Sequence, residues 1–244
     1  MPAPYTRECV CMASAIIAGA GASTGAAVAR MCAARGLAVH GARRQPPPQQ
    51  SSDTFTVSAV DFRDEEAVEA FVARVEESSG PVALGVHNIG ANVQFSVAET
   101  TPRVFRKTWE LAALSSLHFA RALGARMASR GEGTLIFTGA TASLRGAASF
   151  SAFAAAMHAK RALAQSLARE LAPQGVHVAH VVIDGPVDTP FVRQLLGEEK
   201  YGLLKQRGGL LEPDAVAEHY WALHQQPKSA WSFESDLRPH AERW

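Results

Sequence analysis

The sequence has no apolar run as long as the about 18 residues that a transmembrane helix needs, so we expect no membrane span. It also lacks an excess of charge of either sign. Its 24 lysines and arginines nearly balance 23 acidic residues, and the basic residues are scattered along the chain. This pattern argues against nucleic acid and against a membrane surface as partners.

Cysteine is scarce as well, since the chain has only Cys9, Cys11 and Cys32. Their spacing matches no metal-ligand motif, so we expect no metal site. A small, odd set of thiols is typical of reduced cysteines in a cytosolic protein, and we therefore expect a cytoplasmic location. A redox role for Cys9 and Cys11 is the less favoured interpretation.

The sequence does contain a regular alternation of segments. Its 244 residues, 47% of them hydrophobic, suit one domain over residues 1–244, with 1–12 as a loose N-terminal tail. Apolar runs predict strands at 13–19, 37–42, 55–60, 82–87, 134–139 and 176–184, with a final strand inside 229–244. Helical patterns cover 25–35, 65–77, 102–128, 149–173, 190–206 and 212–226.

This alternation is typical of βαβ units. The predicted fold class is α/β, a doubly wound, mostly parallel sheet of about seven strands. One connection breaks the rhythm, because Pro46, Pro47 and Pro48 exclude a regular helix between the second and third strands.

A glycine-rich turn follows the first predicted strand. It reads Ala18-Gly19-Ala20-Gly21-Ala22-Ser23-Thr24-Gly25, and a helical pattern starts directly after it. Glycines allow a tight turn there and let backbone amides at the helix N-terminus approach a pyrophosphate. The position of the turn between a strand and a helix favours a dinucleotide site.

These segments together resemble the classical short-chain dehydrogenases/reductases (SDR family), over residues 13 to about 190. The family's T-G-x-x-x-G-x-G corresponds to residues 18–25, with Ser23 in place of the middle glycine. The resemblance implies a Rossmann fold, a nicotinamide cofactor and membership of an oxidoreductase family.

Further positions match the family's cofactor contacts. Asp61-Phe62 follows the third strand, where the family's aspartate contacts the adenine, and residues 87–90 resemble N-N-A-G. Residues 184–189 resemble P-G-x-x-x-T, which frames the nicotinamide, with Asp184 in place of proline. The resemblance thus implies cofactor-binding roles for Gly19, Gly21, Ser23, Thr24, Gly25, Arg43, Arg44, Asp61, Phe62, Asn88, Gly90, Asp184, Gly185 and Thr189.

Arg43 and Arg44 at the end of the second predicted strand indicate which nucleotide to expect. An acidic residue at position 42 would bind a ribose 2′-OH and repel a 2′-phosphate, but this position holds Ala42. Arg43 can pair with that phosphate through two charge-assisted hydrogen bonds. The sequence therefore favours NADP(H) over NAD(H), with two solvated loop arginines as the alternative.

The family's catalytic positions hold apolar residues here. In the family a tyrosine protonates the substrate carbonyl, and a lysine four residues later holds the nicotinamide ribose and lowers the pKa of the phenol. A serine orients the substrate, and an asparagine supports a water relay. Residues 167–170 resemble the family's L-A-x-E. This alignment places the tyrosine on Phe153, the lysine on Met157, the serine on Ala140 and the asparagine on Ala112. Phe150, in the register of some enoyl reductases, supplies no phenol either.

Polar residues near these positions are weak substitutes. Thr141, Ser143 and Arg145 follow the fifth predicted strand and are substrate-side candidates. Lys160 is predicted to be a snorkelling or interface lysine, and His158 a surface or interface histidine.

We therefore predict an NADP(H)-binding member of this family with a degenerate active site, a pseudoenzyme without conventional carbonyl reduction. Two alternatives stay open. One is an active NADPH-dependent oxidoreductase with an unconventional proton donor; the other is a non-redox protein that binds a ligand in the old crevice. Expected partners are the nucleotide and an unknown small molecule. The resemblance also implies a homodimer or homotetramer, paired through the long helices after the fourth and fifth strands.

Overall fold

The computed structural model of the protein describes residues 13–46 and 55–242. The expected N-terminal tail, Cys9, Cys11 and most of the proline-containing connection lie outside these residues. In the described part of the chain, no helix is long and apolar enough to cross a membrane. The same residues contain no group of three or more His, Cys, Asp or Glu side chains that could hold a metal ion.

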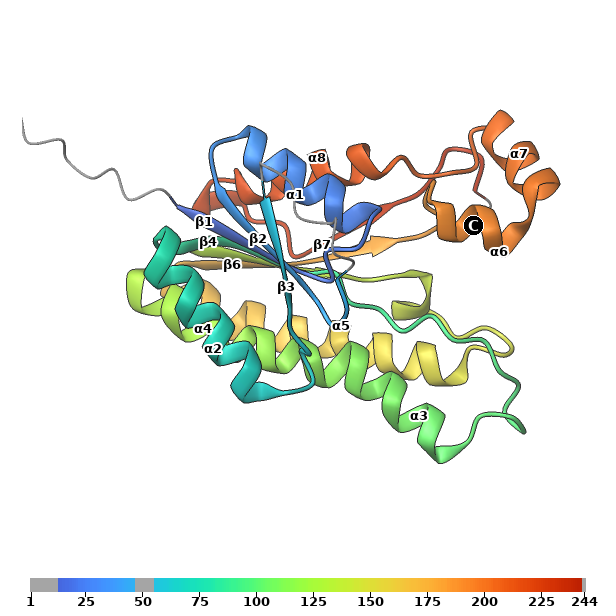
Figure 1. Ribbon diagram of the computed structural model, residues 1–244, viewed down its shortest axis with the longest axis horizontal. Coiled ribbons are helices and arrows are strands. Elements are labelled where there is room, and N and C mark those ends of the chain that lie inside the picture. Colours follow the sequence, from blue (N-terminus) through green and yellow to red (C-terminus); the bar gives the residue numbers. More distant parts are fainter. Residues whose placement is uncertain (1–12, 47–54, 243–244) are drawn as a thin grey trace, which may run out of the picture.

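A seven-stranded parallel sheet with the order β3-β2-β1-β4-β5-β6-β7 forms the centre of the described residues (Figure 1). The strands are β1 (Ser14–Ala18), β2 (Ala38–Arg43), β3 (Phe55–Ala59), β4 (Val82–His87), β5 (Gly133–Thr138), β6 (Val176–Ile183) and β7 (Glu234–Leu237). The predicted fold class is confirmed. The apolar runs mark the first six strands to within one residue at each end.

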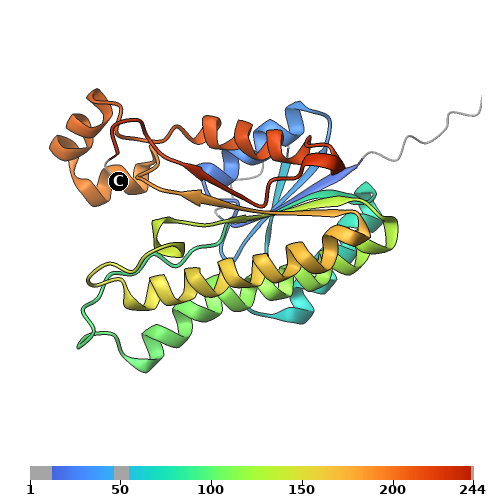
Figure 2. The same cartoon turned by 180° about the vertical axis from the view of Figure 1, so that it is seen from behind.

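Helices cover both faces of the sheet, as Figures 1 and 2 show. On one face lie α1 (Thr24–Ala34) and α8 (Pro213–His224); on the other lie α2 (Glu65–Ser79), α4 (Ser115–Arg130) and α5 (Ser151–Leu171). Successive side chains of a strand point to opposite faces. Ile17 of β1 therefore joins the core under α1 and α8, whereas Ile16 joins the core under the other three helices.

The segment predicted as one helix over 102–128 is interrupted. It begins as α3 (Pro102–Trp109), whose N-cap Thr101 accepts a hydrogen bond from the Val104 amide at 3.3 Å. A π-helical turn, η1 (Glu110–Leu114), then joins α3 to α4. This turn carries the fully buried Ala112. Single π turns inside α-helices are frequent at functional sites.

The segment predicted as helical over 190–206 forms two helices, α6 (Pro190–Leu196) and α7 (Glu198–Gln206). Gly197, with a φ of 77°, separates them. Figure 1 places both helices beyond the carboxyl ends of the strands. The winding of the sheet reverses between β1 and β4, and ligands bind at such a switch point in open α/β sheets.

Candidate active site

The glycine-rich turn after β1 packs tightly against the end of β4. Gly19 has a φ of 84°, and a Cβ there would lie 2.7 Å from the carbonyl oxygen of Asn88. A Cβ on Gly25 would lie 2.5 Å from the carbonyl oxygen of Gly19. Both positions therefore need glycine. A Cβ on Gly21 would meet nothing within 4 Å, so the turn has open space beside this residue.

The N-terminus of α1 offers an anion site. Ser23 is its N-cap residue, but the Ser23 side chain makes no capping hydrogen bond, and the first turn holds no acidic residue. The amides of a helix N-terminus and the helix dipole favour negative charge at that end. A phosphate group is thus chemically suited to this position.

A hollow of about 330 Å³ opens beside the turn, over the ends of β1, β2 and β4 and the residues after β3. Arg43, Arg44 and Arg63 line it together with one acidic residue, Asp61, so basic charge predominates in the lining. The predicted cofactor residues that line this hollow are Gly19, Gly21, Arg43, Arg44, Asp61, Phe62, Asn88 and Gly90.

Asp61 is engaged by a neighbour in this hollow. The Arg63 side chain donates to the Asp61 carboxylate from Nε at 2.9 Å and from Nη2 at 2.5 Å. These hydrogen bonds hold the pKa of Asp61 below its ordinary value. The side chain of Phe62 is buried and packs against the rings of Phe71 and His87. The end of β3 therefore presents an ion pair above an aromatic core.

Asn88 connects the two halves of the crevice. Its backbone N–H donates to Ala18 O at 2.8 Å, and its Nδ2 donates to Gly19 O at 3.2 Å. Asn88, Ile89 and Gly90 line both the first hollow and a second cavity of about 530 Å³. The two spaces are therefore neighbours along the carboxyl edge of the sheet.

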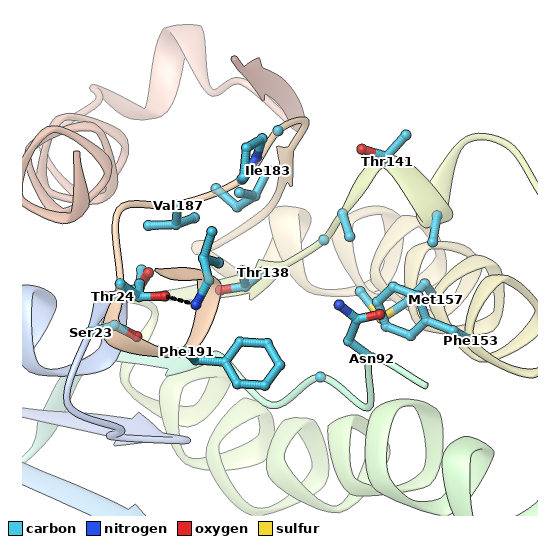
Figure 3. Close-up of a pocket in the computed structure, with 18 of the residues that line it drawn as sticks. Ser23, Thr24, Asn92, Thr138, Thr141, Phe153, Met157, Ile183, Val187 and Phe191 are labelled. Carbon is cyan, nitrogen blue, oxygen red and sulfur yellow. Dashed lines mark hydrogen bonds between the residues drawn. The ribbon is translucent and has the colours of Figure 1, made fainter. Parts of the chain in front are cut away.

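The second cavity, drawn in Figure 3, is mostly apolar. Besides Asn88 and Gly90, the predicted cofactor and substrate-side residues in its lining are Ser23, Thr24, Thr141, Arg145, Gly185 and Thr189. The hydrophobic part of the lining consists of Ile89, Ala140, Ala142, Ala147, Phe150, Phe153, Met157, Ile183, Val187, Phe191, Val192, Leu195 and Leu196. Arg145 is the charged residue of this lining.

The four positions that the alignment assigns to catalysis come together in space. Ala112 of η1, Ala140 after β5, and Phe153 and Met157 of α5 belong to one apolar cluster, with Ala140 at its partly buried edge. Ala140, Phe153 and Met157 also line the second cavity, and Figure 3 shows the last two together on α5. None of these side chains can give or take a proton.

Sequence and structure comparisons agree on the family. A family model described as short chain dehydrogenase matches residues 13–200. The chain belongs to this family. MabA of Mycobacterium avium, a 3-oxoacyl-[acyl-carrier-protein] reductase, is 26% identical over 193 residues, which are 79% of this chain and 74% of MabA.

Two solved structures extend the comparison. A short-chain dehydrogenase from Rhodopseudomonas palustris has a TM-score of 0.77 and 39% identity, covering 93% of this chain and 99% of the other. A metagenomic short-chain oxidoreductase, solved in complex with NADP, shares the fold with a TM-score of 0.76 and 22% identity, covering 93% and 97%. The protein is thus similar to oxidoreductases of the short-chain dehydrogenase family over most of its length.

The hydroxyl groups of the two tyrosines of the described residues are both engaged in hydrogen bonds. Tyr201 donates its hydroxyl to Asp188, and Tyr220 of α8 is fully buried. The Tyr220 hydroxyl shares a 2.7 Å hydrogen bond with Thr138 Oγ1, and burial raises its pKa. Neither tyrosine lines the cavity, whereas Thr138 does.

Asp184 and Ser143, predicted to contact the cofactor and the substrate, do not line the second cavity. Asp184 is buried, accepts a hydrogen bond from Thr141 Oγ1 at 2.5 Å, and lies 3.2 Å from Arg238. Its carboxylate therefore ties the turn after β5 to the chain after β7. Ser143 is also buried, and its Oγ accepts from the Ala140 amide at 3.1 Å. Both side chains therefore form hydrogen bonds to residues of the cavity lining, Asp184 to Thr141 and Ser143 to Ala140.

Lys160 is fully buried, so the prediction of a snorkelling or interface lysine was wrong. Its Nζ donates to Ile89 O at 2.6 Å and to Thr138 O at 3.2 Å. Ala156 and Ala164, four residues to either side, are fully buried as well, so Lys160 lies on the sheet-facing side of α5. His158 is exposed, as expected.

The contribution of α6 to the cavity was missed in the sequence. Phe191 and Leu195 line the cavity, although their side chains are 61% and 62% exposed. In Figure 3 Phe191 lies near the centre of the view, to the left of Asn92, Phe153 and Met157. Two large apolar residues four positions apart share one helical face. Their place directly after the P-G-x-x-x-T-like segment was the available signal.

Proposed function

We propose that this protein binds NADP(H) in the crevice formed by the first hollow and the second cavity, and that it does not carry out conventional carbonyl reduction. The gathering of Ala112, Ala140, Phe153 and Met157 in one apolar cluster at the cavity is the main observation in support of the missing reduction. A bound nicotinamide supplies a hydride, so carbonyl reduction also needs a proton. A positioned acid–base group typically contributes about 10²–10⁴ in rate, and this cluster offers none.

The residues of the first hollow fit such a nucleotide. The open space at Gly21 suits a pyrophosphate, together with the adjoining N-terminus of α1, where Ser23 and Thr24 line the second cavity. Arg43 and Arg44 would hold a 2′-phosphate, since guanidinium groups bind phosphate through paired hydrogen bonds. The structural neighbour that was solved with NADP shows that a protein of this fold can hold that nucleotide.

The second cavity fits the nicotinamide end and an additional ligand. Asn88 is held against Gly19, and Thr189 caps α6 by accepting from the Val192 amide at 3.1 Å. We propose that Asn88, Gly185 and Thr189 border the nicotinamide. The remaining apolar wall suits a ligand with a hydrophobic body. Asn92, Thr138, Thr141 and Arg145 are polar side chains in the same lining, although Thr141 already donates to Asp184.

The test combines nucleotide binding with turnover. We expect NADPH to raise the thermal transition temperature of the protein, and we expect no NADPH oxidation above the protein-free rate over a panel of aldehydes, ketones and enoyl thioesters. Turnover on any of these substrates would instead support an oxidoreductase that takes its proton from water or from the substrate. If neither NADPH nor NADH binds, the result favours a non-redox protein that binds another ligand in the crevice.

We further propose that copies of the chain pair through α4 and α5 into a homodimer or homotetramer. Ala155 and Ala162 are exposed on α5, and small exposed residues permit close helix approach. Sedimentation velocity at micromolar concentration should show the oligomer, and a monomer alone would contradict it. The cytoplasmic location inferred from cysteine usage stays a prediction.

A further inference from the structure

Lys160 is a buried cation without a role in the chemistry described so far. Its side chain is fully enclosed and does not line the cavity. Both of its carbonyl acceptors, Ile89 O and Thr138 O, belong to residues that do line the cavity. The ammonium group therefore lies directly behind the cavity wall, where the ends of β4 and β5 meet α5.

Other ionisable groups around Lys160 do not neutralise it. His87 of β4 is fully buried, and burial lowers its pKa well below the ordinary value. Burial also lowers the pKa of His180 of β6 to about 4, while His180 Nδ1 lies 2.9 Å from Glu234. Glu234 in turn accepts hydrogen bonds from Arg161 at 2.6 and 2.7 Å. Tyr220 of α8 keeps its proton, because burial raises its pKa.

Lys160 is thus the group of this set that changes charge near neutral pH. Burial lowers the pKa of Lys160 to about 7, whereas the two histidines stay neutral and Glu234 stays ionised above pH 6. Below neutral pH the cavity wall is backed by a positive charge that is absent at higher pH.

We propose that Lys160 is a positioning residue for the redox state of the bound nucleotide: its ammonium, held on the carbonyls of Ile89 and Thr138, favours the neutral reduced nicotinamide over the cationic oxidised ring. This inference rests on the proposed nucleotide binding. Like charges repel strongly in a partly desolvated site, whereas the reduced ring carries no charge to repel. The protein then distinguishes NADPH from NADP⁺ without a catalytic tyrosine or lysine in the cavity.

The experiment measures dissociation constants of NADPH and NADP⁺ at pH 6 and pH 9 by calorimetry. We expect the ratio of the NADP⁺ constant to the NADPH constant to fall about fivefold between these pH values in the unmodified protein. Ionisation of the 2′-phosphate changes both constants alike, so it cancels in the ratio. This comparison requires no substitution and is independent of whether variants fold.

Variants separate charge from hydrogen bonding. Lys160→Met removes both, and Lys160→Gln keeps a donor without the charge; both should give a low ratio at pH 6 that does not change with pH. Restoration of the normal ratio by Lys160→Gln would show that only the hydrogen bonds matter and would overturn the proposal. Lys228→Met is the matched control, because Lys228 Nζ also donates to a backbone carbonyl, Gly131 O at 2.8 Å, but is exposed and does not line the cavity.

A nucleotide fragment separates the test of the role of Lys160 from the test of nucleotide binding. Adenosine 2′,5′-bisphosphate lacks the nicotinamide, so its affinity should be the same in the Lys160 variants and the unmodified protein. If this fragment and NADPH bind but the ratio is independent of pH, the role of Lys160 is refuted and nucleotide binding stands. If none of the three ligands binds, the proposed function fails and this inference fails with it.

Discussion

Phe153 and Met157 lie four residues apart on α5, belong to one apolar cluster and line the same cavity. The alignment through residues 167–170 predicts that these two positions correspond to the family's proton donor and to the lysine that activates it. Ala140, at the position of the substrate-orienting serine, borders the same cavity. Ala140, Phe153 and Met157 thus form part of an apolar wall, and the first hollow lies beside this cavity.

Restoring three side chains tests this account of the cavity. Ala140→Ser, Phe153→Tyr and Met157→Lys together should give measurable NADPH-dependent reduction of simple ketones or aldehydes from a near-zero baseline. Phe153→Tyr alone should do little, because a phenol with a pKa of about 10 is a weak acid at neutral pH. NADPH absorbance follows the reaction.

Folding and nucleotide binding are the controls for the triple variant. Met157 is almost fully buried, so a lysine there has to be desolvated, and circular dichroism must show an intact fold first. A folded, NADPH-binding but inactive triple variant would show that the cavity no longer admits a carbonyl substrate in a productive position.

Arg43 should decide between the two nicotinamide nucleotides. It lines the first hollow at the end of β2, where a 2′-phosphate is expected. Arg43→Ala should weaken NADPH binding by about 1.5–3 kcal/mol, the range for hydrogen bonds to charged groups, and leave NADH binding nearly unchanged. Calorimetric titration of both nucleotides measures the difference. Equal weakening of both would mean that the arginine does not contact the phosphate.

Lys160 should make stability depend on pH in a defined direction. Its folded pKa of about 7 lies below the ordinary 10.5, so between these values the unfolded chain binds one more proton than the folded protein. Folding stability then rises with pH by up to about 1.4 kcal/mol per pH unit, and this gain is absent below pH 7. Relative to Lys160→Met, the unmodified protein should gain about 2 kcal/mol from pH 7.5 to pH 9.

Urea denaturation at each pH measures that difference. Cys32 and Tyr220 also have raised pKa values, but both are present in the variant, so their contributions cancel. Parallel pH profiles of the two proteins would contradict the titration of Lys160 near neutral pH.

The sheet could be predicted because its signals are local. Each buried strand forms a short apolar run, and the glycine turn shows which strand end carries the crevice. The π turn at Glu110–Leu114 could not be predicted, since its residues also suit an α-helix. The ion pair of Asp184 could not be predicted either, because its partner Arg238 is far away in sequence and no local motif reveals this contact.

Lys160 shows where a residue-by-residue rule gives the wrong answer. Lysine is usually exposed, and the prediction for Lys160 followed this preference although its helical spacing places it on the inward face of the helix. Ala156, Lys160 and Ala164 recur every four residues and mark the inward face of α5. The carbonyls of Ile89 and Thr138, which offset part of the cost of burying the ammonium, come from two strand ends that only the tertiary structure brings together.

The central claim is that the crevice binds NADP(H) although the positions aligned with the family's catalytic residues are apolar. The most direct measurement is a calorimetric titration of the unmodified protein with NADPH at neutral pH. The account predicts saturable binding with a dissociation constant in the micromolar range or below, tighter than that for NADH. Absence of any binding heat or thermal stabilisation at millimolar NADPH would contradict it.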